Sequence, residues 1–213
     1  MKFYPPNGYA PIGNDRKIDE ALRKFYDFCV AKDVPVFTHC TPVGVEAGED
    51  FGCKSDPKIW RKVLDYERGR WSMLRLCFGH AGGEVGWFSL KPAKPRMCEP
   101  PENSFADEAI RICSTKKYPN VYCEFGYLNE VRNKAGVLKL QTKLIAAIDA
   151  SEEGRELASR VCFGTDWHMP EMVIKGTRVY VDRLREVFKH DKLKSHAPVF
   201  FAGNARRFLQ MKP

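Results

Sequence analysis

Three apolar stretches of the 213-residue chain each run into a side chain that can bind a metal ion or transfer a proton. VPVFTHC carries His39, LRLCFGHAGG carries His80, and VCFGTDWHM carries Asp166 directly after Gly-Thr. β-Branched and aromatic residues followed at once by small or turn-forming residues are typical of buried strands that end at a loop. We therefore expect these three side chains at the carboxyl ends of strands, facing an open mouth where chemistry can occur.

The spacing of these residues predicts the fold class. His39, His80, Glu124 and Asp166 are separated by 41, 44 and 42 residues, and strand-like and helix-like segments alternate throughout the chain. This order favours an α/β fold with a parallel sheet, built from a repeated βα unit. The form of repeated βα architecture that we favour is the (β/α)8 barrel of the TIM type, whose active site is formed by the loops that follow the strands.

Only five strands are predicted, near residues 2, 36, 76, 122 and 162, whereas a closed barrel needs eight. Residues 1–213 are therefore predicted to form a single incomplete domain, a partial barrel of about five βα units (strands 4 to 8) whose first three units are missing. Two open sheet edges predict a homo-oligomer or pairing with a separate amino-terminal half. The segment 81–103, rich in glycine and proline, is predicted to be an irregular excursion of the kind that often forms a lid.

Composition restricts the possible partners and compartments. The chain is 44% hydrophobic and 29% charged, as in ordinary globular proteins, and its apolar runs fall far short of the roughly 20 residues that span a bilayer. Its opening lacks a signal-peptide pattern, so a cytoplasmic location without membrane contact is expected. The net charge is +8, yet Lys and Arg are spread along the chain. This distribution favours small anionic substrates over a nucleic acid.

The eight cysteines are expected to include no disulfide framework, because four of them lie inside apolar patterns and no CxxC occurs: Cys29, Cys77, Cys123 and Cys162. These four are predicted to be buried thiols in a reducing compartment. Cys40, Cys53 and Cys98 fall in predicted loops, where a cysteine metal site is an alternative.

The ordered set VFTHC, LCFGHAGG, YPNVYCEFG, CFGTDW and FAGNARRFL resembles the amidohydrolase superfamily, specifically the amidohydrolase-2 group of metal-dependent decarboxylases and hydrolases of carboxylated substrates. The opening KFYPPNGYAPIG looks like the fourth strand and loop of that group, so the resemblance covers essentially the whole chain. It implies a metal-dependent hydrolase or decarboxylase that acts on a small carbonyl or carboxylate substrate.

The resemblance also implies a role for each strand-end residue. His39 corresponds to a metal-binding histidine, His80 to a second ligand or to the residue that polarises the substrate, and Asp166 to a ligand and general base. The implied cofactor is a divalent metal, commonly zinc, which lowers the pKa of its bound water toward roughly 7 so that a carboxylate can take the proton. Without the resemblance, the alternative roles are a buried core histidine for His39 and a helix N-cap for Asp166.

The chain departs from this family at one point. Family members begin with a His-x-His pair that supplies two metal ligands, and this sequence contains no such pair. The implied metal is therefore expected to be weakly held or absent. Two other interpretations follow: a catalytically inactive relative that acts as a binding or assembly module or needs a separate amino-terminal half, and a metal-free, lactonase-like enzyme.

Three other residues have weaker signals. Glu124 is predicted either to touch substrate or to fill the barrel floor beside a basic partner. His168 is either a substrate contact or a surface histidine. Lys2 lies on the strand where some relatives carry a carboxylated lysine, and we assign it no role.

Overall fold

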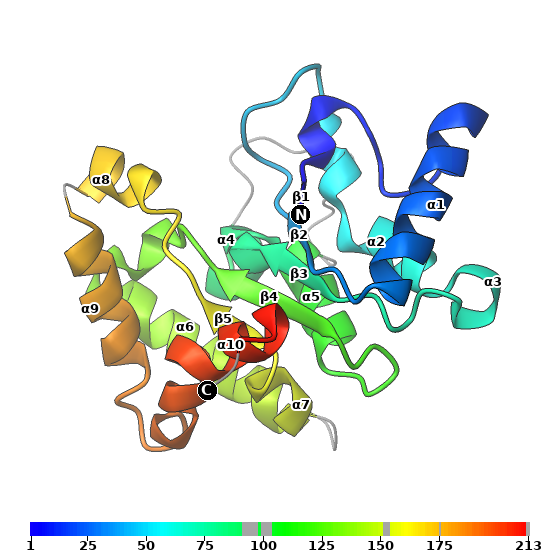
Figure 1. Ribbon diagram of the computed structural model, residues 1–213. Helices are drawn as coiled ribbons and strands as arrows, with labels where there is room; N and C mark the ends of the chain where they lie inside the picture. Colours follow the sequence, from blue (N-terminus) through cyan, green and yellow to red (C-terminus); the bar gives the residue numbers. More distant parts are fainter. Residues whose placement is uncertain (91–97, 99–103, 151–153, 175, 212–213) are drawn as a thin grey trace.

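A five-stranded, all-parallel sheet forms the centre of the computed structural model (Figure 1). The structure describes residues 1–90, 98, 104–150, 154–174 and 176–211. The strands lie side by side in chain order: β1 (Lys2–Phe3), β2 (Val36–His39), β3 (Leu76–Gly79), β4 (Val121–Phe125) and β5 (Val161–Phe163). The α/β class and the parallel sheet are confirmed, whereas the assignment of these strands to a partial barrel stays a prediction.

Helices connect the strands. They are α1 (Arg16–Ala31), α2 (Pro57–Leu64), α3 (Tyr66–Gly69), α4 (Glu84–Phe88), α5 (Phe105–Cys113), α6 (Lys134–Asp149), α7 (Gly154–Ala158), α8 (His168–Ile174), α9 (Thr177–Val187) and α10 (Asn204–Leu209). Short helical turns lie at η1 (Pro5–Asn7), η2 (Phe51–Ser55), η3 (His80–Gly82), η4 (Asn129–Arg132), η5 (Lys194–His196) and η6 (Val199–Gly203). Among the described residues, no helix combines the length and the apolar character that crossing a bilayer requires.

The starts of the helices follow from capping side chains. Asp15 is extended and its carboxylate accepts from the amides of Lys17 and Ile18, so it begins α1. The neighbouring Asn14 does not cap this helix, and its side-chain amide donates to the carbonyl of Ala10. Asp56 caps α2 by accepting from the amide of Lys58. A short side chain that accepts from the first free amides replaces the hydrogen bonds that the first turn of a helix lacks.

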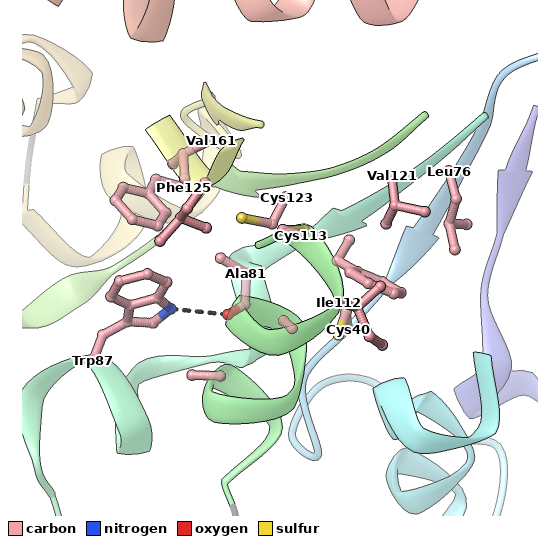
Figure 2. Packing of buried hydrophobic residues seen from close by; sticks show 14 of the residues in the cluster. Cys40, Leu76, Ala81, Trp87, Ile112, Cys113, Val121, Cys123, Phe125 and Val161 are labelled. Carbon is pink, nitrogen blue, oxygen red and sulfur yellow. Dashed lines mark hydrogen bonds between the residues drawn. The ribbon is translucent and has the colours of Figure 1, made fainter. Parts of the chain in front are cut away.

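The two faces of the sheet differ because side chains alternate along a strand. One face carries Leu76, Phe78, Val121, Cys123 and Val161, all buried in the large apolar core that α1, α2, α5, α6 and α9 complete. Figure 2 shows part of this core around β3, β4 and β5. Burial of this face against the helices is the main stabilising contribution to the fold.

On the opposite face, α10 covers the part of the sheet that precedes the carboxyl ends of the strands. Cys77, Tyr122 and Cys162 form a small buried cluster there with Phe208 of α10, whose ring centroid lies 5.5 Å from that of Tyr122. The side-chain amide of Asn204 fixes the start of α10 to β5 by donating to the carbonyl of Val161 at 2.6 Å. By alternation, His39 and Glu124 belong to this same face, nearer the carboxyl ends of the strands.

The predicted excursion 81–103 is partly ordered. Its first part forms η3 and α4, and the indole of Trp87 donates to the carbonyl of Ala81 at 2.8 Å (Figure 2). An irregular structure is therefore wrong for residues 81–88. Residues 91–97 and 99–103, on which the prediction of a lid also rests, lie outside the described residues.

A disulfide joins Cys53 in η2 to Cys98, with 5.4 Å between their Cα atoms. The expectation of no disulfide and the alternative of a metal site at these two cysteines are both wrong, because each sulfur is bonded to the other. The remaining cysteines are buried, as predicted for Cys29, Cys77, Cys123 and Cys162. Disulfides persist in oxidising environments and are rare in a reducing cytoplasm. The cytoplasmic location stays a prediction, and this bond does not favour it.

Replacing Phe125 by alanine should strongly destabilise the protein. Phe125 is fully buried on β4, between the rings of Trp87 and Phe200, with centroids 4.8 and 5.7 Å away. Loss of a buried phenyl ring costs about 3–5 kcal/mol of unfolding free energy. The matched control is Phe28→Ala on α1, because Phe28 is 54% exposed. Urea unfolding of both variants tests this, and equal losses would contradict the assigned core.

Removing the disulfide should lower stability without changing the fold. The bond spans 45 residues, for which the loss of chain entropy in the unfolded state is worth about 4 kcal/mol. We expect this loss in the double variant Cys53→Ser/Cys98→Ser. In the unfolded parent protein without reductant, a thiol titration should detect six free thiols among the eight cysteines. Eight free thiols in protein purified without reductant would show that the bond does not form.

Candidate functional site

The carboxyl ends of β2, β3 and β4 bring the predicted residues together. His39 pairs in register with Gly79, and Gly79 pairs with Glu124, so the three residues form one row across the sheet. His80 follows Gly79 directly, and Asp166 lies three residues beyond β5. Both His80 and Asp166 adopt left-handed backbone conformations, with φ of 61° and 48°. Such conformations are uncommon for these residue types and often occur at functional sites.

His39 is buried, with 5% of its surface exposed, and lies between two aromatic rings. Its ring centroid is 4.7 Å from that of Tyr4 and 4.9 Å from that of His80, which it meets edge to face. Its Nε2 lies 3.0 Å from the carbonyl oxygen of Val43 in the loop after β2. Since a carbonyl oxygen only accepts, Nε2 carries the proton and Nδ1 keeps the unshared pair.

His80 shows the complementary arrangement. Its Nδ1 lies 3.0 Å from the carbonyl oxygen of Gly126, so Nδ1 carries the proton and Nε2 keeps the unshared pair. Imidazoles that bind metals or transfer protons commonly donate their second ring N–H to such an acceptor, which fixes the tautomer and the ring orientation. Both histidines are therefore held with one basic nitrogen available.

The surroundings keep both imidazoles neutral. Burial lowers the pKa of His39 to about 4, with further lowering from His80 and Lys2, while Val43 and Asp166 act in the opposite direction. Burial also lowers the pKa of His80, opposed by its hydrogen bond to Gly126 and by the charge of Asp166. Neutral imidazoles at pH 7 are the form that can accept a proton or bind a metal ion.

Glu124 is the residue whose importance the sequence understated. Its carboxylate accepts from the backbone amide of His80 at 3.3 Å, and the backbone of Gly126 lies close to it. Burial raises the pKa of this carboxyl to about 7, with a further increase from Asp166 and a decrease from Lys2. A hydrogen bond to this carboxylate comes from the backbone amide of His80, and Lys2, a basic residue, acts on it electrostatically. In the sequence, the only indication of this arrangement is that a glycine, Gly126, follows Glu124 by two residues.

Asp166 lies at the more open side of the site. Its side chain is 29% exposed and its Oδ1 is 3.6 Å from Nδ1 of His168, whose side chain is 56% exposed. The negative charge of Asp166 raises the pKa values of His39, His80 and Glu124. His168 is thus both exposed and next to the site. Lys2 acts electrostatically on the same three residues, and its Nζ lies 5.8 Å from the centre of the Tyr4 ring.

The residues present fit a metal ion only in part. His39 and His80 offer two basic nitrogens from adjacent rings. Within the described part of the chain, however, no group of three or more His, Cys, Asp or Glu side chains is placed to hold one ion. A catalytic zinc site usually has three protein ligands. The set of His39, His80 and Asp166 as joint ligands therefore stays a prediction, and no reaction step is assigned to a metal.

Comparison of the chain with protein-family models, with curated proteins and with solved structures found no match.

Replacing Glu124 by glutamine should change how stability depends on pH. The folded protein keeps a proton on Glu124 up to about pH 7, whereas the unfolded chain loses it near pH 4.5. The stability that this proton gives is present below pH 4.5 and is lost as the pH rises through about 7. Relative to the parent protein, Glu124→Gln should therefore gain about 3 kcal/mol of unfolding free energy between pH 4 and pH 8.

Urea unfolding at several pH values measures this difference, with Glu49→Gln as the control because Glu49 is exposed. A difference between Glu124→Gln and the parent that stays constant with pH would show that Glu124 titrates as an ordinary carboxyl.

Proposed function

We propose that this chain carries the strand-end residues of an amidohydrolase-type hydrolase or decarboxylase acting on a small carbonyl or carboxylate substrate. One observation carries the proposal. The rings of His39 and His80 lie 4.9 Å apart at the carboxyl edge of a parallel sheet, and each donates one ring N–H to a backbone carbonyl. Two neutral imidazoles fixed in this way at a strand end are candidates for proton transfer or metal binding.

Asp166 is the proposed general base. Its carboxylate is partly exposed, so water and a small substrate can reach it, and it lies within electrostatic reach of both histidines. His80 is neutral and holds its unshared pair on Nε2, so it can accept a proton from water or substrate when no metal ion is bound at that nitrogen. A positioned acid or base of this kind contributes about 10²–10⁴-fold to a rate.

A divalent cation, zinc for preference, would be held by Nδ1 of His39 and Nε2 of His80. Bound there, it would polarise a carbonyl oxygen and lower the pKa of a coordinated water. Two imidazoles make a weak site, and we propose that the remaining ligands come from residues outside 1–213 or from a second copy of this chain. The resemblance to strands 4 to 8 of a barrel supports this arrangement, since the first strand of the amidohydrolase-2 group carries the His-x-His pair.

The shortage of ligands favours two further candidates. A metal-free, lactonase-like hydrolase would use Asp166 and His80 alone. A catalytically inactive relative would retain the residues at the sheet edge and act as a binding or assembly module. Both candidates rest on the same observation, that the described residues place no three donor side chains around one point.

Zinc titration of the purified chain tests the proposal. We expect zinc to bind weakly, and His39→Ala and His80→Ala each to reduce the affinity at least tenfold, since each removes one of two donors. The control is His190→Ala, because His190 is exposed after α9. Calorimetry measures all four proteins. Equal zinc binding in all of them would show that these nitrogens are not ligands.

Catalysis is tested with lactones, amides and carboxylated aromatic compounds, with and without zinc. Asp166→Asn should lower any hydrolysis or decarboxylation by about 10²–10⁴-fold. Zinc-independent hydrolysis that needs Asp166 would support the lactonase-like candidate. A folded protein without activity, alone and after addition of a partner chain that carries a His-x-His pair, would leave the binding module as the better account.

A further inference from the structure

A closed set of hydrogen bonds joins the ends of β3 and β4. The backbone amide of His80 donates to Oε2 of Glu124 at 3.3 Å. The backbone of Gly126 lies against the same carboxylate, since a Cβ atom added there would be 2.6 Å from Oε1 of Glu124. The carbonyl of Gly126 in turn accepts from Nδ1 of the His80 ring at 3.0 Å. The main chain and the side chain of His80 are therefore both held by the two-residue segment that begins at Glu124.

The backbone of His80 needs such support. The pairing of β3 with β4 ends at Gly79 and Glu124, so the amide of His80 has no further strand partner. His80 and Ala81 both turn into the left-handed region, with φ of 61° and 46°, a conformation that is costly for residues other than glycine. The turn is closed by the amide of Gly83, which donates to the carbonyl of His80 at 2.7 Å. The carboxylate of Glu124 accepts from the backbone amide of His80, which this turn would otherwise leave without a hydrogen-bond partner.

Space for the carboxylate is provided by two glycines. A Cβ atom added at Gly164 would lie 1.3 Å from Oε1 of Glu124, and one added at Gly126 would lie 2.6 Å from it. Neither glycine adopts the left-handed conformation that requires glycine at other positions of this chain. Their lack of a side chain is thus explained by the room that Glu124 occupies.

We propose that Glu124 is a positioning residue for His80. By holding the amide of His80, its carboxylate keeps the end of β3 against the segment 124–126, so that the carbonyl of Gly126 can accept the Nδ1 proton. This fixes His80 in the tautomer whose Nε2 carries the unshared pair. The inference deepens the proposed function, since it explains how His80 is kept ready for a substrate or metal ion.

The tautomer of His80 can be measured without substrate or metal, by ¹⁵N NMR of the protein with labelled histidine. His80→Gln assigns the signal. In the parent protein we expect His80 to be protonated on Nδ1 and His39 on Nε2. Glu124→Ala should abolish the preference of His80 for the Nδ1-protonated form, whereas Glu124→Gln, which keeps an accepting oxygen, should retain it. The tautomer of His39 should change in neither variant.

Gly164→Ala provides a second route to the same displacement, because its methyl group would occupy the position of the carboxylate. It should shift His80 as Glu124→Ala does. The matched control is Gly203→Ala, since a Cβ there would meet nothing closer than 3.4 Å.

Three results would overturn the inference: an Nε2-protonated His80 in the parent protein, an unchanged His80 tautomer in folded Glu124→Ala, or loss of the tautomer in Gly203→Ala as well as in Gly164→Ala. If Glu124→Ala does not fold, the parent tautomer and the comparison of Glu124→Gln with Gly164→Ala decide. Failure of zinc binding or catalysis would contradict the proposed function and leave these NMR results unaffected.

Discussion

The availability of the two imidazoles depends on where two backbone carbonyls lie. Val43 and Gly126 belong to the loops after β2 and β4, and each of their carbonyl oxygens takes the proton-bearing nitrogen of one histidine. As a result, the nitrogen without a proton is Nδ1 in His39 and Nε2 in His80. The strand ends bring the rings to one edge of the sheet, and the loops then determine which atom of each ring can react.

The same crowding has electrostatic consequences of opposite sign. Burial keeps His39 neutral, so the folded state gains stability as the pH rises from about 4 to 6.5. Burial keeps Glu124 protonated, so the folded state loses stability between about pH 4.5 and 7. The two effects are similar in size and largely cancel over the interval that they share. His39 and Glu124 thus make opposing contributions to the pH dependence of stability, and the lowered pKa of His80 adds to the contribution of His39.

Much of the framework could be predicted from the sequence, because it depends on local patterns. Apolar runs ending in His39 and His80, repeated at about 42 residues, fixed the strands and the edge at which both histidines lie. Helix α8 was missed, since seven residues that include Pro170 show no helical periodicity. The bond between Cys53 and Cys98 could not be found from spacing, because it depends on how two distant loops meet. The choice of tautomer depends on carbonyl directions, which no residue type encodes.

The space shared by Glu124 and Gly164 links two positions that are far apart in the chain. In the sequence, Glu124 is a strand-end acid and Gly164 is part of a turn. In the fold, the side chain of Glu124 occupies the space that a side chain at position 164 would need. A shorter acid at 124 would leave room for a methyl group at 164. Substitutions that harm the protein singly can therefore be compatible together, and a lineage of such chains would be expected to change these two residues in concert. Residue covariation, more than invariance of either position, would be the evolutionary trace of this contact.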